Sequence, residues 1–218
     1  MNTESPFVIT ISRELGSGGR SIGEKLAGKL GVRYCDKLLI RSLVSQFNLT
    51  TYEIEKIKAK KKNWLADFLE KVAPVPRADM ILGPRPGQEG TPFPHFTTSE
   101  EIFAAETEIL HAVADEGSCV IAGRSGFFVL KDHPNKLDVF IRASRPKRIE
   151  RVMTKQGVSR EEAATIIDSV DEGRDNFVKH FAGTSRYDAR NYDLVLNMDN
   201  LDEDDAVELI LDFIKHNR

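Results

Sequence analysis

The chain has 218 residues and a mass of 24.5 kDa, and 40% of its residues are hydrophobic while 30% are charged. This length allows one domain with a substantial core, so we expect a single domain over residues 1–218. The formal net charge of −3 and a pI near 6.0 argue against a protein that neutralises many nucleic-acid phosphates, and they favour small-molecule partners.

The start of the chain and its cysteines indicate the compartment. The segment MNTESPFVITIS lacks a positively charged region, and no stretch approaches the roughly 18 consecutive apolar residues of a membrane span. These features predict a cytoplasmic protein that does not contact a membrane. Cys35 and Cys119 form no C-x-x-C motif, which favours two reduced, buried thiols over a disulfide or a zinc site.

The first elements predicted along the chain are a buried strand over 6–12 and a helix over 20–31. The strand is continuously apolar, and the helix places Ile22, Leu26 and Leu30 four residues apart. Continuous apolarity is typical of a strand covered on both faces. The chain therefore opens as a strand, a turn and a helix.

The next segments are less regular. Residues 74–95 contain six of the nine prolines and three glycines, so they predict an irregular loop, either a surface excursion or a flap that contacts a substrate. The basic run KAKKKN at 58–63 fits a solvated helix surface, because no aromatic residues interleave with it. Neither segment predicts nucleic-acid binding.

Strands and helices alternate again in the second half of the chain. Ser159 with Glu162 forms a capping box, and the acidic run DEDDAVELI is typical of a helix start. Alternating strands and helices predict an α/β fold, with a parallel sheet covered by helices on both faces. The predicted helices are 99–116, 145–156, 160–181 and 203–216, and the predicted strands are 118–122, 137–142 and 192–197.

The turn after the first strand has the form of an altered phosphate-binding loop. Aligning G-x-x-x-x-G-K-[ST] on Gly19, Arg20 and Ser21 puts Glu14 in the place of the first glycine and an arginine in the place of the lysine. Glycines allow the backbone to approach an anion, and the start of a helix attracts negative charge. The alternative is an ordinary glycine-rich turn. The predicted phosphate-binding residues are Gly16, Ser17, Gly18, Gly19, Arg20 and Ser21.

Three stretches of the sequence resemble the cytidylate kinase-like proteins, a branch of the nucleoside monophosphate kinases. They are ITISRELGSGGRSIGEKLAGKLGVRYCDKLLI (9–40), CVIAGRSGFFVLKDHPNKLDVFIRASRPKRIERV (119–152), and DEGRDNF with NYDLVLNMDNL (171–177 and 191–201). In that branch an arginine at the lysine position is usual, so the resemblance explains Arg20. It implies ATP and Mg²⁺ as cofactors, and nucleotides as substrates.

The resemblance also implies a three-layer P-loop kinase fold, with a helical lid and a segment that binds the phosphate acceptor. The implied parts are a core over about 1–48 and 99–218, an insertion or acceptor segment over about 49–98, and a lid over about 145–185. Phosphoryl transfer mainly requires positioned anions and stabilised negative charge, which arginines and magnesium supply. Basic residues that converge on the loop are therefore the candidate site residues.

The resemblance assigns these residues as follows. The catalytic residues are Arg20, Arg124, Arg148 and Arg151, Ser21 holds Mg²⁺, and the acceptor-binding residues are Asp36, Arg124, Asp171 and Arg174. Arg124 follows a predicted strand, at the end where doubly wound sheets bind ligands. Asp171 and Arg174 stand one turn apart, a spacing that also suits a plain helix ion pair.

Two positions depart from the family pattern. Ser125 stands where an aspartate commonly follows the arginine, and Ile167 stands where a further arginine is expected. Both positions belong to the implied acceptor site. The sequence therefore leaves three hypotheses open: a CMP or dCMP kinase, a P-loop kinase with another small acceptor, and a nucleotide-binding regulatory protein with little catalysis.

Overall fold

The computed structural model describes residues 1–36, 99–123 and 125–217. The chain divides into two compact units, one made of Met1–Lys37 with Gly117–Arg218 and the other of Leu38–Glu116. The described part of the second unit is essentially one helix, α5 (Ser99–Asp115), as the sequence predicts. The predicted loop 74–95 and the basic run 58–63 lie outside the described residues.

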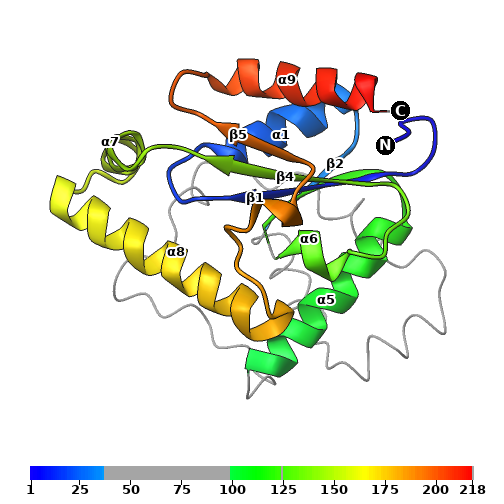
Figure 1. Ribbon diagram of the computed structural model, residues 1–218, viewed down its shortest axis with the longest axis horizontal. Helices are drawn as coiled ribbons and strands as arrows, with labels where there is room; N and C mark the ends of the chain where they lie inside the picture. The colour runs from blue at the N-terminus through cyan, green and yellow to red at the C-terminus, as the bar shows by residue number, and fades with distance from the viewer. Residues whose placement is uncertain (37–98, 124, 218) are drawn as a thin grey trace. The chain divides into compact units, whose positions relative to one another are not determined.

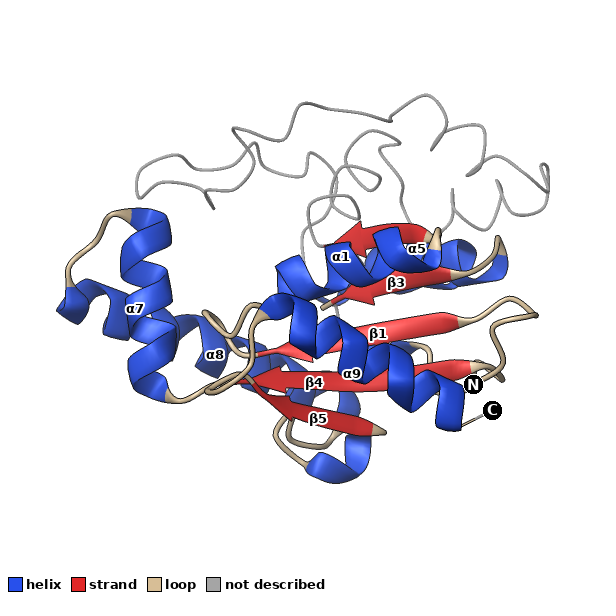
Figure 2. Cartoon of the chain, turned by 90° about the horizontal axis from the view of Figure 1, so that it is seen from above, coloured by secondary structure: helices blue, strands red, loops and turns tan. Residues whose placement is uncertain are grey.

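The first unit contains a five-stranded sheet in which every strand pairing is parallel (Figures 1 and 2). The strand order is β2-β3-β1-β4-β5, so the first strand lies at the centre. The elements are β1 (Val8–Arg13), α1 (Gly19–Leu30), β2 (Arg33–Asp36), β3 (Cys119–Ala122), α6 (Gly126–Val129), β4 (Lys136–Arg142), α7 (Arg145–Gln156), α8 (Arg160–Ala182), a 3-10 helix (Ala189–Asn191), β5 (Leu194–Asn197) and α9 (Glu203–His216).

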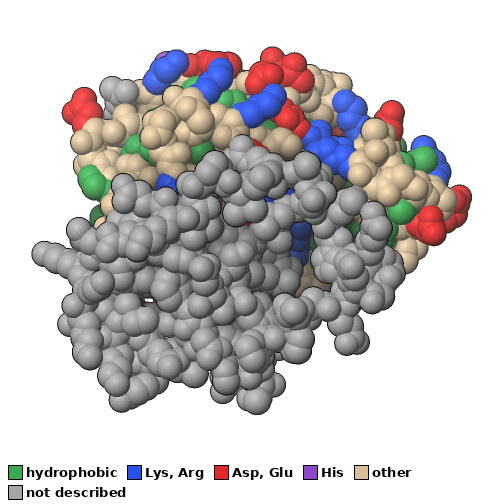
Figure 3. Space-filling view, turned by 180° about the vertical axis from the view of Figure 1, so that it is seen from behind, with side chains coloured by type: hydrophobic (Ala, Val, Ile, Leu, Met, Phe, Trp, Pro, Cys, Tyr) green, Lys and Arg blue, Asp and Glu red, His purple; other side chains and the backbone are tan. Residues whose placement is uncertain are grey.

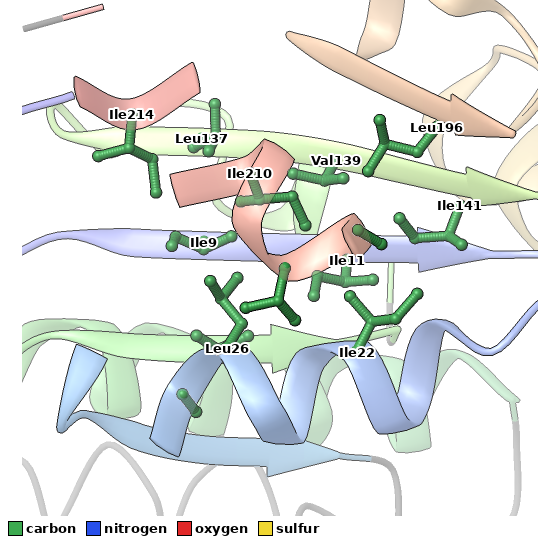
Figure 4. Packing of buried hydrophobic residues seen from close by; sticks show 14 of the residues in the cluster. Ile9, Ile11, Ile22, Leu26, Leu137, Val139, Ile141, Leu196, Ile210 and Ile214 are labelled. Atoms are coloured by element: carbon green, nitrogen blue, oxygen red, sulfur yellow. The ribbon is translucent and has the colours of Figure 1, made fainter. Parts of the chain in front are cut away.

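Alternate residues of β1 supply the two faces of the sheet. Ile9 and Ile11 belong to the core cluster that contains the buried side chains of α1 and α9 (Figure 4). Thr10 is equally buried on the other face, where its methyl group approaches α6 at Gly126. A strand covered on both faces needs a continuous apolar run, which explains the pattern of this segment. The α/β fold with helices on both faces is therefore confirmed.

The helix ends follow their local sequence signals. Ser159 and Glu162 form the predicted capping box at the start of α8, and Asp202 and Asp205 form another at the start of α9. Helices α7 and α8 pack together as a hairpin beyond the ends of the strands (Figure 2). The hairpin lies within residues 145–185, the segment that the resemblance implies to be a lid.

Strand β2 is missing from the sequence prediction. It is only four residues long, among the described strands it pairs with β3 alone, and its sequence RYCD begins and ends with a charged residue. A short edge strand gives no continuous apolar run, so periodicity does not reveal it. Cys35 in this strand and Cys119 in β3 are buried free thiols as predicted, and burial raises the pKa of the Cys119 thiol to about 12.

Among the described residues, no helix has the length and apolar character needed to cross a bilayer. The N-terminal amine of Met1 donates a hydrogen bond of 2.6 Å to the carbonyl of Asn217, so the two termini lie side by side.

Candidate active site

The candidate site lies where the parallel strands end, because all five point toward the same edge of the sheet (Figure 2). The turn from β1 to α1 lies at this edge. Asp36 ends β2, and Gly123 follows β3. Arg124, which was predicted to meet the acceptor phosphate, lies outside the described residues.

Two glycines of the loop occupy positions that require glycine. Gly16 has a φ of 83°, and a Cβ atom there would lie 2.7 Å from the backbone oxygen of Arg148. Gly18 has a φ of 94° and immediately precedes α1. Residues with a side chain rarely adopt such φ values. The glycines thus let the loop turn tightly against α7.

Ser17 lies in the predicted phosphate loop but points inward. Its hydroxyl contacts the carbonyl oxygens of Glu14 at 2.9 Å and Ile141 at 3.1 Å, and the residue is only 1% exposed. The side chain therefore fastens the loop to β4. Its N–H also donates to the carbonyl of Glu14, at 3.3 Å, so Ser17 shapes the loop rather than offering a hydrogen bond to phosphate.

Glu14 replaces the first glycine of the usual loop pattern, and the structure explains this departure. Its carboxylate accepts a 3.0 Å hydrogen bond from the N–H of Ala143, and its Oε2 lies 3.6 Å from Nε of Arg148. Its own N–H donates to the carbonyl of Ile141. Glu14 therefore fixes the loop to the β4–α7 connection.

The start of α1 has no side-chain cap, and neither has the start of α7. Gly18 provides no side-chain cap, and the first turn has no acidic residue, whereas α8 and α9 each have a capping box and acidic first turns. Within the described residues, the N–H groups of Gly16, Gly18, Gly19, Arg20 and Ser21 have no acceptor, and the first helical hydrogen bond runs from Ile22 to the carbonyl of Gly18. These groups, with the hydroxyl of Ser21 in that turn, fit a bound phosphate and its metal.

Arg20 is the second residue of the same helix and bears the charge that the usual lysine would supply. Its Nη2 lies 2.9 Å from Oδ2 of Asp36, and its side chain is 42% exposed. The hydroxyl of Tyr34 donates to the carbonyl of Arg20 at 3.1 Å. The structure thus brings two predicted site residues, Arg20 and Asp36, into direct contact.

Asp171 is the centre of a buried ionic cluster. Nη1 of Arg148 lies 2.6 Å from its Oδ2, and Nη1 of Arg174 lies 3.2 Å from its Oδ1. Arg186 adds a third guanidinium 3.4 Å from Oδ1. The N–H of Leu15 donates to both oxygens, at 3.0 and 3.3 Å. The D-x-x-R pair is therefore far more than a surface ion pair.

Three residues of this region, Arg13, Glu14 and Arg186, were not predicted as site residues. Arg174 and Arg186 both donate to the carbonyl of Arg13, at the end of β1. Arg186 is 4% exposed and lies against the rings of Phe140 and Tyr187. No sequence spacing connects Arg186 with the loop about 170 residues away. For Arg13 and Glu14 a signal existed, since both flank the glycine-rich turn.

The described residues at this edge carry more positive than negative charge. Five guanidinium groups lie near three carboxylates. The guanidinium groups are those of Arg13, Arg20, Arg148, Arg174 and Arg186, and the carboxylates are those of Glu14, Asp36 and Asp171. Burial and then the charges of Arg13 and Arg186 lower the pKa of Arg174 to about 10, and burial also lowers the pKa of Arg13. An anion bound here would relieve this repulsion.

An open pocket of about 460 Å³ lies beside the loop, within the volume range of small-molecule sites. Basic and acidic side chains are interspersed over the described part of the face in Figure 3. In the pocket, burial and then the charge of Arg151 lower the pKa of Lys155. The lining residues are Gly16, Ser17, Ala143, Lys147, Glu150, Arg151, Thr154, Lys155, Met198, Leu201, Asp202 and Glu203.

Arg151 lies directly over the loop. A Cβ atom on Gly18 would be 3.2 Å from its Nη1, and its guanidinium forms an ion pair with Glu203 at the start of α9. Arg148 lies one turn earlier and is 9% exposed, because it is held by Asp171 and by the carbonyl of Leu15. The two arginines of α7 therefore have different surroundings. Arg151 lines the pocket, whereas Arg148 is buried and donates to the carbonyl of Leu15 in the loop.

Comparison with known proteins identifies the family of this chain. The sequence model of the cytidylate kinase-like family matches residues 8–200. The chain belongs to this family. The resemblance seen in the sequence is thereby confirmed, together with the fold that it implied.

The proteins that are similar to this chain in structure have little sequence identity with it. An uncharacterized protein from Eubacterium ventriosum has a TM-score of 0.68 at 21% identity, over 97% of this chain and 99% of that one. A shikimate kinase from Bacteroides thetaiotaomicron has a TM-score of 0.49 at 14% identity, over 96% and 98% of the two chains. A uronate isomerase from Corynebacterium glutamicum is 33% identical over 105 residues, which are 48% of this chain but only 20% of the isomerase.

Proposed function

We propose that the protein transfers a phosphoryl group from ATP, with Mg²⁺, to a nucleoside monophosphate, with CMP or dCMP as the first candidates. The observation that carries the proposal is the uncapped start of α1 behind the Gly16–Ser21 loop, beside an excess of arginine charge. Membership of the cytidylate kinase-like family supports the same reaction. Small-molecule nucleotides are thus the proposed partners.

The triphosphate would bind to the free N–H groups of the loop, and the nucleoside would occupy the adjoining pocket. Ser21 is the residue that would hold Mg²⁺, which when bound would neutralise part of the phosphate charge. Arg20 and Arg151, which lie beside the loop, would stabilise the charge that develops on the transferred group. We assign Arg148 a supporting role, because its guanidinium holds Leu15 and Asp171.

A second candidate is a P-loop kinase with a different small acceptor. Ile167, at a position where the family resemblance implies an arginine, is 1% exposed and packs in the apolar core of the α7–α8 hairpin. Asp171, the predicted acceptor ligand, already accepts hydrogen bonds from four residues. Both observations weaken the match to a cytidylate acceptor site.

Nucleotide binding is expected to raise the melting temperature. At about 100 times its Kd, ATP with Mg²⁺ should stabilise the native state by about 2.7 kcal/mol, which corresponds to roughly 5–10 °C for a chain of this size. Thermal unfolding with and without the nucleotide measures the shift. Adding a chelator should reduce it, and Ser21→Ala should make the shift insensitive to magnesium. Unchanged melting at millimolar ATP or ADP would contradict nucleotide binding.

A further inference from the structure

Asp171 contacts the phosphate loop itself, and these contacts suggest a role other than binding the acceptor. The residue lies in the middle of α8 and is 5% exposed. Its Oδ1 accepts from Leu15 N–H at 3.0 Å, from Arg174 at 3.2 Å and from Arg186 at 3.4 Å. Its Oδ2 accepts from Arg148 at 2.6 Å. Two carboxylate oxygens offer about four acceptor positions, so little capacity is left for a ligand.

The groups around Asp171 hold the first half of the loop. Leu15 donates its N–H to Asp171, and its carbonyl accepts from Arg148 at 3.3 Å. The carbonyl of Arg13 accepts from Arg174 and Arg186, which also contact Asp171. One carboxylate therefore orients three guanidinium groups onto the backbone of residues 13–15. In the second half of the loop, the N–H of Ser17 donates to the carbonyl of Glu14 at 3.3 Å, and the N–H groups of Gly16 and Gly18 have no acceptor among the described residues.

We propose that Asp171 is a positioning residue that fixes the phosphate loop to the α7–α8 hairpin, and that it does not bind the acceptor. Its partners come from the loop, both hairpin helices and the segment after α8. Hydrogen bonds to a charged, buried group are stronger than neutral ones, so this contact can hold a loop that has no regular structure. The loop is thereby preorganised before a nucleotide arrives.

Asp171→Asn tests this proposal, with Asp168→Asn as the matched control. Asp168 lies one turn earlier on α8 and also forms an ion pair with an arginine of α7, Arg145, but it is exposed and does not contact the loop. Both variants remove one carboxylate charge from an α7–α8 ion pair. Only Asp171→Asn removes charge from the contact with Leu15.

The first measurement is hydrogen exchange in the absence of nucleotide. In Asp171→Asn the amide of Leu15 should exchange at least tenfold faster, while the amides in the centre of β1 stay protected, and Asp168→Asn should match the wild type. Equal exchange at Leu15 in both variants would overturn the proposal. Because no nucleotide is present, this result is independent of whether the protein is a kinase.

The second measurement rests on the proposed function and compares two affinities at a temperature where both variants are folded. A positioning role predicts that Asp171→Asn weakens ATP binding about tenfold or more, and at least as strongly as it weakens CMP binding. A role as acceptor ligand predicts weaker CMP binding with unchanged ATP binding, which would overturn the proposal. A wild type that binds no nucleotide would refute the proposed function, and the exchange result would still decide the role of Asp171.

Discussion

Replacing Arg20 by alanine is expected to lower kcat about 100-fold, which corresponds to roughly 2.7 kcal/mol of transition-state stabilisation. The residue stands in the lysine position of the loop, and its partly exposed guanidinium is held by Asp36 at 2.9 Å. The fold should remain intact, because no core contact is lost. Steady-state kinetics and thermal unfolding of the same sample measure both effects.

Arg20→Lys separates the charge from its geometry. Lysine supplies a compact point charge, whereas arginine makes paired planar contacts, so we expect only partial activity. Lys29→Ala is the control, since Lys29 lies on the same helix and pairs with Glu208 away from the loop. Full activity of Arg20→Lys would show that charge alone matters. Unchanged kinetics of Arg20→Ala would show that the backbone binds the phosphate without this side chain.

Gly16→Ala is expected to destabilise the protein by about 2–4 kcal/mol and to abolish the stabilisation by ATP. The φ of 83° disfavours any side chain, and the new Cβ would lie 2.7 Å from the backbone oxygen of Arg148. Backbone atoms of a packed helix cannot move away cheaply, so the loop itself must shift. Urea unfolding with and without nucleotide measures both consequences.

Gly28→Ala is the matched control for this substitution. Gly28 lies in α1, and a Cβ atom there would meet nothing within 4 Å. Alanine in an exposed helix interior should stabilise the protein by about 0.5–1 kcal/mol. Opposite signs for the two variants would show that the effect at Gly16 comes from its position. Equal, small effects would contradict the close approach of the loop to α7.

The features that the sequence predicts correctly are those that depend on neighbouring residues. The capping box of Ser159 and Glu162 forms as expected, and the apolar run of β1 lies buried between two layers. Gly16 and Gly18 adopt positive φ values, as the glycine-rich pattern of the loop predicts. Local pattern is sufficient for such elements, because their signals lie within a few residues of each other.

The side-chain arrangement of the site could not be read from the same patterns. Ser17 fastens the loop to Ile141, and Glu14 accepts from Ala143, although both partners are more than 120 residues away. Arg186 reaches Arg13 from a segment with no motif of its own. Tertiary contacts decide which polar side chains of a loop point inward. A family pattern therefore identifies Asp171 without showing that its oxygens are already occupied.

Transfer of the labelled γ-phosphoryl group of ATP tests the central claim most directly. The protein would be incubated with Mg²⁺ and the labelled ATP, together with CMP, dCMP, the other nucleoside monophosphates, or small hydroxylated metabolites, and the labelled products would be separated. The account predicts a labelled nucleoside diphosphate, formed first from CMP or dCMP, and its loss in Arg20→Ala or without Mg²⁺. Transfer only to another metabolite would select the second candidate acceptor. Absence of label on every acceptor would contradict a phosphoryl-transfer function for this site.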